Sequence, residues 1–177
     1  MPNTHNLEDD RVSSYIVRRE VMEELINSPE YQKLLPYVPY LLTAVFLRLI
    51  FVIYLCLAGK KTLLLIKEEN RCITPSQVWL LLIPFFNIYW NFMFMRRMVD
   101  SLNNEFYDRQ VAVEENPTEK YGYFFAGTFL VYNFPLPIFI GFVVYILSII
   151  ALIVYIAKLN EYKKLLEDET LGFNDQF

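Results

Sequence analysis

The side chains that could do chemistry in this sequence are polar groups set inside long apolar runs. Arg48 is the one charged residue in the apolar block of residues 37–58. Gln77, Asn87 and Asn91 follow at offsets of 0, 10 and 14, which on one continuous helix places them on the same face. An arginine inside a membrane is a functional-site candidate by default, because a buried charge must find a partner. We therefore predict that Arg48, Asn87, Asn91 and Gln77 are the binding residues.

The partner of Arg48 stays open at the level of the sequence, because the apolar blocks contain no Asp or Glu. One possibility is a set of internal partners, namely Asn87, Asn91, tyrosine hydroxyls and the Leu80 carbonyl that Pro84 leaves without its helical hydrogen bond. Thr128 and Ser148, from the last two apolar segments, are expected to approach the middle of the membrane as well. The second possibility is a carboxylate of another subunit, and the third is an anionic lipid or a small acidic ligand.

Catalytic and metal-binding chemistry has few candidate residues. His5 is the only histidine, and the two cysteines form no CxxC pair. The acidic pair Glu114 and Glu115 is typical of a solvated face, and no zinc-protease or Walker motif occurs. The net charge of −4 also removes the usual electrostatic case for nucleic acid. We expect no catalytic residue, no metal and no cofactor, and we predict that the chain is not an enzyme.

The composition indicates a membrane protein, since 55% of the 177 residues are hydrophobic and only 20% are charged. Residues 37–58 would form a helix of about 33 Å, which matches a hydrocarbon core of about 30 Å. The central Arg48 costs about 2.5 to 3.5 kcal/mol on the insertion scale, whereas the Leu, Ile, Phe and Val residues around it gain roughly 4 to 7 kcal/mol. We therefore expect this block to insert despite its charge.

The remaining apolar sequence predicts three further spans. A cap and proline at Thr74–Gln77 mark the start of the second one. Residues 121–157 contain no Asp, Glu, Lys or Arg and are too long for one span, so the two prolines within residues 133–137 should divide them. The sequence leaves open whether the third segment crosses fully or is re-entrant. The predicted fold is all-α, an integral membrane four-helix bundle of two transmembrane hairpins, with spans at 37–58, 76–98, 117–134 and 138–158.

The positions of Lys and Arg set the predicted orientation. In a four-span arrangement, eleven of these residues lie on the side of both termini and four on the other side, namely Lys60, Lys61, Lys67 and Arg71. Loops rich in Lys and Arg stay in the cytoplasm. We therefore expect a multi-pass protein of the bacterial inner membrane with both termini cytoplasmic.

Two regions flank the predicted transmembrane domain of residues 36–160. In the N-terminal region, residues 1–35, apolar residues recur at nearly helical spacing from 12 to 27. We predict a cytoplasmic amphipathic helix there, which either lies on the membrane surface or packs on the protein's own loops. The C-terminal region, residues 161–177, is a short acidic tail.

One pattern resembles a known family. Within Ile73–Trp90, Val-Trp, Pro and Asn-x-x-Trp follow at characteristic spacing, and the pattern continues in Ser101–Phe106 and Tyr155–Tyr162. This stretch, roughly residues 70–165, resembles a family of small multi-span membrane proteins of the Bacteroidota. The resemblance implies a bacterial inner membrane and four spans, but no activity. Residues 1–35 depart from the family pattern.

These observations favour a non-catalytic accessory or scaffold subunit of a bacterial inner-membrane complex. It would dock through its intramembrane polar residues and the N-terminal helix. Its expected partners are the lipid bilayer and either a protein subunit or a second copy of the chain. The alternative is a small transporter or a membrane protein that binds lipid or another small ligand. A subunit should purify with stoichiometric partners in mild detergent, whereas a carrier should purify alone.

Overall fold

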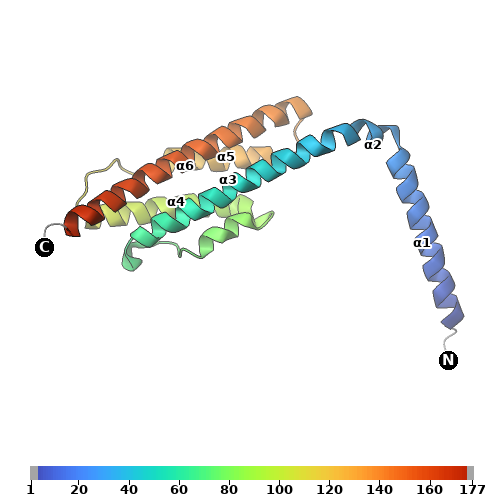
Figure 1. The fold of residues 1–177 in the computed structure, drawn as a ribbon, viewed down its shortest axis with the longest axis horizontal. Helices are drawn as coiled ribbons and strands as arrows, with labels where there is room; N and C mark the ends of the chain where they lie inside the picture. The colour runs from blue at the N-terminus through green and yellow to red at the C-terminus, as the bar shows by residue number, and fades with distance from the viewer. Residues whose placement is uncertain (1–3, 175–177) are drawn as a thin grey trace. The chain divides into compact units, whose positions relative to one another are not determined.

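The computed structural model describes the backbone of residues 4–174 and the side chains of Ser13 and residues 15–168. This described part of the chain is helical and contains no strand, so the all-α prediction is confirmed. Figure 1 shows the helices, whose bounds are α1 Thr4–Asn27, α2 Pro29–Leu34, α3 Val38–Leu65, α4 Phe86–Asp108, α5 Glu119–Tyr132 and α6 Ile138–Asn174. Short 3₁₀ helices lie between them: η1 Leu35–Tyr37, η2 Glu68–Asn70 and η3 Gln77–Leu82. The chain divides into two compact units, Met1–Leu47 and Arg48–Phe177.

The first unit contains the helix predicted for the N-terminal region. Ser28 ends α1 and caps α2, because its Oγ accepts the N–H of Tyr31 at 3.3 Å and Pro29 takes the first helical position. All side chains from Tyr15 to Asn27 are exposed. The presence of a helix is confirmed. Its amphipathic character, its cytoplasmic side and its place on the membrane surface or on the protein's own loops stay predictions.

In the second unit, which we call the bundle, the predicted second span is a hairpin. The backbone N–H of Cys72 donates to Ser101 Oγ at 2.8 Å, and further in, Trp90 Nε1 donates to the carbonyl of Gln77 at 3.1 Å. Such nested pairs arise only where a chain doubles back on itself. The turn lies at Pro84 and Phe85, between η3 and α4. We call residues 73–95 the half-hairpin.

Local chemistry explains why the half-hairpin replaces a continuous helix. The predicted contact between Thr74 and Gln77 is present, since the N–H of Thr74 donates to Gln77 Oε1 at 3.2 Å. The predicted helix start is not: η3 begins only at Gln77, and its cap residue Ser76 makes no side-chain capping hydrogen bond. Pro84 has no N–H to continue the helix, and Phe85 takes a φ of 62°. That left-handed conformation reverses the chain direction. The ring of Phe85 is 88% exposed at the tip.

The half-hairpin overturns the predicted pair of transmembrane hairpins. Lys67, from the loop after α3, forms an ion pair with Asp108 at the end of α4, with 3.0 Å between Nζ and Oδ2. The prediction placed these two loops on opposite sides of the bilayer, which an ion pair of this length forbids. Among the residues that the structure describes, two helical stretches are long and apolar enough to be candidate spans, Pro29–Leu65 and Ile138–Asp168.

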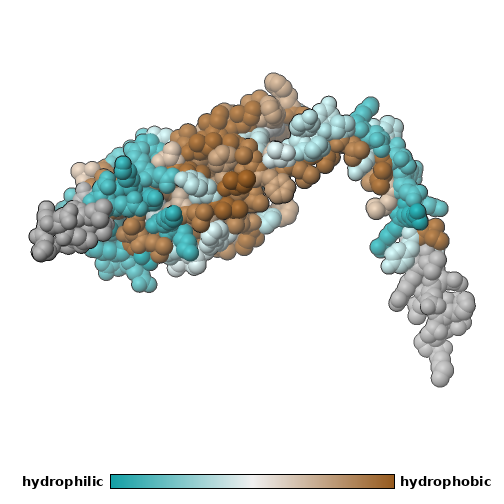
Figure 2. Space-filling view, viewed as in Figure 1, coloured by the Kyte–Doolittle hydropathy of each residue, from teal (hydrophilic) through white to brown (hydrophobic). Residues whose placement is uncertain are grey.

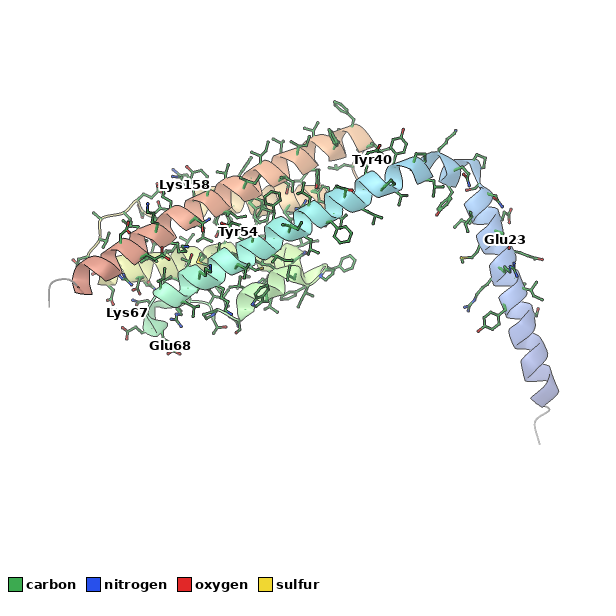
Figure 3. The ribbon with its side chains drawn as sticks, in the orientation of Figure 1. Glu23, Tyr40, Tyr54, Lys67, Glu68 and Lys158 are labelled. Carbon is green, nitrogen blue, oxygen red and sulfur yellow. The ribbon has the colours of Figure 1, made fainter. Side chains whose placement is uncertain are left out.

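The break predicted within residues 133–137 is confirmed, because α5 ends at Tyr132 and α6 starts at Ile138. The connection folds α5 back along α6. The bundle segment of α3 runs parallel to α6. Arg48 Nη2 donates to Ser148 Oγ at 3.1 Å, and further along both helices Asn160 Nδ2 donates to Tyr54 OH at 3.5 Å. Figure 3 shows Tyr54 on the stretch of α3 beside α6. The 14 residues of α5 extend about 21 Å, less than a full hydrocarbon core.

The core of the bundle forms where α4 packs on α3, α5 and α6. Phe94 and Met95 are fully buried, as is Tyr155 of α6. Two glycines make room for side chains of α4. A Cβ on Gly59 would lie 2.9 Å from Phe94 Cζ, and one on Gly122 would lie 3.0 Å from Met95 Sδ. Any larger residue at either position would therefore displace a fully buried side chain of α4.

A polar cluster closes the end of the bundle where α3 and α4 finish. Glu105 is fully buried. Its Oε2 accepts the N–H of Lys67 and Nδ2 of Asn70, both at 2.9 Å, and its Oε1 accepts Nε and Nη2 of Arg109, both at 2.8 Å. Arg109 also donates to the carbonyls of Leu65 at 3.0 Å and Leu166 at 3.1 Å. This Glu105 cluster therefore ties α3, α4 and α6 together.

The Glu105 cluster predicts a loss of stability in acid. Burial alone would raise the pKa of Glu105, but the hydrogen bonds from Asn70, Lys67 and Arg109 outweigh it and hold the pKa below its usual value. The Glu105 carboxylate therefore binds a proton more readily in the unfolded chain than in the folded one. Its contribution to stability is complete above the ordinary glutamate pKa and is lost as the pH falls through the lowered pKa of the folded state. Thermal unfolding in mild detergent, compared between neutral and acidic pH, should show this loss. A Glu105→Gln variant should show a shallower pH dependence, and equal slopes would contradict the assignment.

A broad apolar surface surrounds the middle of the bundle. On α6, Ile138, Phe139 and Phe142 are 62 to 89% exposed, and on α3 Ile50 is 62% exposed. Figure 2 shows these hydrophobic regions as a brown band across the bundle, with hydrophilic teal at the end that holds the Glu105 cluster. An exposed apolar surface of this extent marks contact with a membrane or a partner protein.

Candidate functional site

Arg48 lies in a cage of aromatic rings. Its Nη2 donates to Ser148 Oγ at 3.1 Å. The guanidinium carbon lies 4.6 Å from the ring centre of Phe129, 4.7 Å from that of Tyr132 and 6.0 Å from that of Tyr145. We call these five residues the Arg48 cage. Each aromatic contact of this kind contributes about 0.5 to 2 kcal/mol, depending on how dry the site is.

Three helices build the Arg48 cage. Phe129 and Tyr132 are three residues apart on α5, and Tyr145 and Ser148 are three apart on α6, so each pair shares a helix face. The turn between α5 and α6 brings the two faces together, and the rings of Tyr132 and Tyr145 lie 5.5 Å apart. The parallel course of α3 and α6 then sets Arg48 at the level of Ser148.

The hydrogen bonding of Arg48 is incomplete within the chain. Nη1 is buried and has no hydrogen-bond partner. Among the ion pairs of the described residues, none includes Arg48. A buried donor without a partner costs about 1 to 3 kcal/mol, and more when the group is charged. The aromatic rings compensate the charge in part but accept no conventional hydrogen bond from Nη1.

The structure separates the predicted binding residues. Asn87 and Asn91 lie on α4 after the turn, and Nδ2 of Asn91 donates to the carbonyl of Asn87 at 2.8 Å. Gln77 lies on η3, before the turn. The polar face predicted for one continuous helix is therefore divided by the half-hairpin, and the hydrogen bond of Arg48 goes to Ser148 rather than to Asn87 or Asn91.

The sequence predicted Ser148 and Thr128 near the middle of the membrane and tyrosine hydroxyls as partners of Arg48, but not which rings form the cage. Ser148 accepts a hydrogen bond from Arg48, whereas Thr128 donates to carbonyls of its own helix. The sequence signal for the cage was a pair of tyrosines, Tyr132 and Tyr145, on either side of the break at residues 133–137. The turn at that break brings the two rings together.

The side chain of His5 lies outside the described residues. Glu114 accepts a hydrogen bond from Tyr162 OH at 2.6 Å. Within the described residues, no group of three His, Cys, Asp or Glu side chains could hold a metal ion.

Comparison of the chain with protein-family models, with curated proteins and with solved structures finds no match. The resemblance to the Bacteroidota family therefore stays a prediction.

Proposed function

We propose that the chain is a non-catalytic integral membrane accessory or scaffold subunit of a bacterial inner-membrane complex, and that Arg48 is its docking residue. The observation that carries the proposal is the buried Nη1 of Arg48, which has no hydrogen-bond partner in an aromatic cage. In this proposal the exposed side chains of α1 supply a second contact.

The apolar surface and the charge distribution support a membrane location with a revised topology. In this proposal α3, α5 and α6 cross the bilayer, whereas the half-hairpin enters and leaves on one side. Eleven Lys and Arg residues then gather at the end of the bundle with the Glu105 cluster, and four precede α3. The positive-inside rule makes the eleven-residue end cytoplasmic. The end of α6 is then cytoplasmic.

The chemistry of the Arg48 cage favours a carboxylate as the partner group. A planar guanidinium held by flat rings keeps a fixed direction, which suits the directed hydrogen bonds that arginine makes to carboxylates. In a low-dielectric surrounding such a bond is strong, and a neutral side chain could not compensate the charge. We therefore propose that an Asp or Glu from another subunit, or from a second copy, binds the guanidinium at Nη1. Because Nη1 is buried in the isolated chain, the rings of the Arg48 cage must move aside for this contact.

Native mass measurement of the complex purified in mild detergent tests this function. The wild-type chain should appear with a stoichiometric partner or a second copy. In Arg48→Leu the assembly should weaken roughly 10- to 150-fold, which corresponds to the about 1.5 to 3 kcal/mol of one hydrogen bond to a charged group. The control is Ile50→Ala, which changes an exposed apolar residue of the same helix.

Arg48→Lys provides a second test, because it keeps the charge but loses the planar geometry, and its assembly should lie between that of the wild type and Arg48→Leu. The thermal unfolding midpoint of each variant shows whether the bundle itself remains folded. An Arg48→Leu chain that is folded and keeps its partner at wild-type stoichiometry would contradict the proposal, and so would a wild-type chain that always purifies as a monomer.

A further inference from the structure

A second polar site lies between α4 and α5 and shares no residue with the Arg48 cage. It is a cleft of about 240 Å³ between α4 and α5, lined by Arg96, Val99, Asp100, Asn116, Glu119 and Tyr123. Asn116 is fixed in the wall by a hydrogen bond that Asn103 Nδ2 donates to its Oδ1 at 3.0 Å. The loop takes a left-handed φ of 58° at Asn116, a conformation that asparagine adopts more readily than most residues. The wall of the cleft is therefore a defined structure.

The charged groups of this cleft are of both signs and are not paired with one another. Arg96 and Asp100 are one turn apart on α4, and Glu119 begins α5. None of the three takes part in the ion pairs of the described residues. One cation and two carboxylates around a single cleft match a ligand that carries an anionic group and an ammonium group close together.

The position of the cleft indicates where such a ligand comes from. Along α4, Arg96 lies between an apolar stretch and a polar end. The buried residues Phe94 and Met95 precede it, and the Glu105 cluster follows it. Tyr123 and Phe124 of α5, 38% and 57% exposed, continue the apolar surface from the cleft. Tyrosine at such a boundary is typical of the level of lipid headgroups.

We propose that this cleft binds the phosphoethanolamine headgroup of a phospholipid. The guanidinium of Arg96 binds the phosphate, and the carboxylates of Asp100 and Glu119 accept hydrogen bonds from the ammonium group. The acyl chains lie along the exposed rings of Tyr123 and Phe124. Phosphatidylglycerol brings no ammonium and leaves both carboxylates unpaired, whereas the trimethylammonium of phosphatidylcholine has no N–H to donate. The inference does not depend on the docking role of Arg48.

Native mass measurement with added lipid tests the proposal. The purified full chain is titrated with phosphatidylethanolamine, phosphatidylglycerol and phosphatidylcholine that carry identical acyl chains. Phosphatidylethanolamine should bind about tenfold more tightly than either of the others, as expected for one additional hydrogen bond to a charged group. Asp100→Asn with Glu119→Gln should abolish this preference, and Arg96→Gln should weaken all three lipids.

Matched controls remove charges that lie outside the cleft, Arg97→Gln beside Arg96 and Glu115→Gln before Glu119. They should bind lipid as the wild type does. Circular dichroism shows that each variant compared is folded. Equal binding of the three lipids, or a preference that survives the paired carboxylate variant, would overturn the proposal. Free phosphoethanolamine that binds as tightly as the lipid would also overturn it, since the cleft would then be a site for a soluble ligand.

Discussion

Replacing Arg109 with methionine is expected to lower the free energy of unfolding by about 3 to 5 kcal/mol. The substitution leaves the fully buried carboxylate of Glu105 without its cation, and removing one partner of a buried ion pair is far more costly than replacing both. It also removes the hydrogen bonds to the carbonyls of Leu65 and Leu166. Unfolding by heat or denaturant in mild detergent, followed by circular dichroism, measures the loss.

An exposed ion pair in the same cluster provides the matched control. Lys67 and Asp108 are 3.0 Å apart, close to the 2.8 Å of Arg109 and Glu105, but both side chains are largely in solvent. Asp108→Asn should therefore change stability little, since exposed pairs are screened. The double variant Glu105→Gln, Arg109→Met should be more stable than Arg109→Met alone. If Arg109→Met unfolds no more easily than Asp108→Asn, the buried pair is not what holds the three helices.

Much of the secondary structure follows from local chemistry and could be predicted. The prolines between Tyr132 and Ile138 divide two apolar segments because proline has no N–H for the helix. Ser28 and Pro29 start a helix for the same kind of local reason, as a side-chain oxygen caps it. The long apolar runs of α3 and α6 are visible directly in composition.

The half-hairpin could not be predicted, because local signals at Thr74 and Pro84 are compatible with a kinked span as well as a turn. The reversal depends on Phe85, a non-glycine residue with positive φ, and such a conformation is held by tertiary packing. Trp90, whose indole N–H reaches back to η3, supplies part of that packing. The count of Lys and Arg did not expose the error, since it assigns sides only after a topology is assumed.

The sequence indicated Arg48 and the depth of Ser148, but not the rings around them. Arg48 was recognisable because a lone charge in an apolar helix is conspicuous. The neighbours of Arg48 depend on which helix lies beside α3. Because residues 73–95 form the half-hairpin, Arg48 reaches Ser148 of α6 rather than Asn87. A long-range register of this kind is not encoded in any short segment.

A second expected result is a difference in cysteine labelling between loops on the two sides of the membrane. Glu69 follows α3 and Glu115 follows α4, and both are exposed near the Glu105 cluster. Phe134 lies in the turn between α5 and α6, 59% exposed. Single cysteines at these three positions, in a chain whose exposed Cys72 is replaced by serine, report the sides directly.

A membrane-impermeant maleimide, applied to intact spheroplasts and to inverted vesicles, is the most direct test that α3, α5 and α6 cross the bilayer around a half-hairpin. Labelling should be all or none: the cysteines at 69 and 115 react only in inverted vesicles, and the cysteine at 134 reacts only in spheroplasts. Labelling of positions 69 and 115 from opposite sides would contradict the half-hairpin, and labelling of all three from one side would contradict the membrane crossing itself.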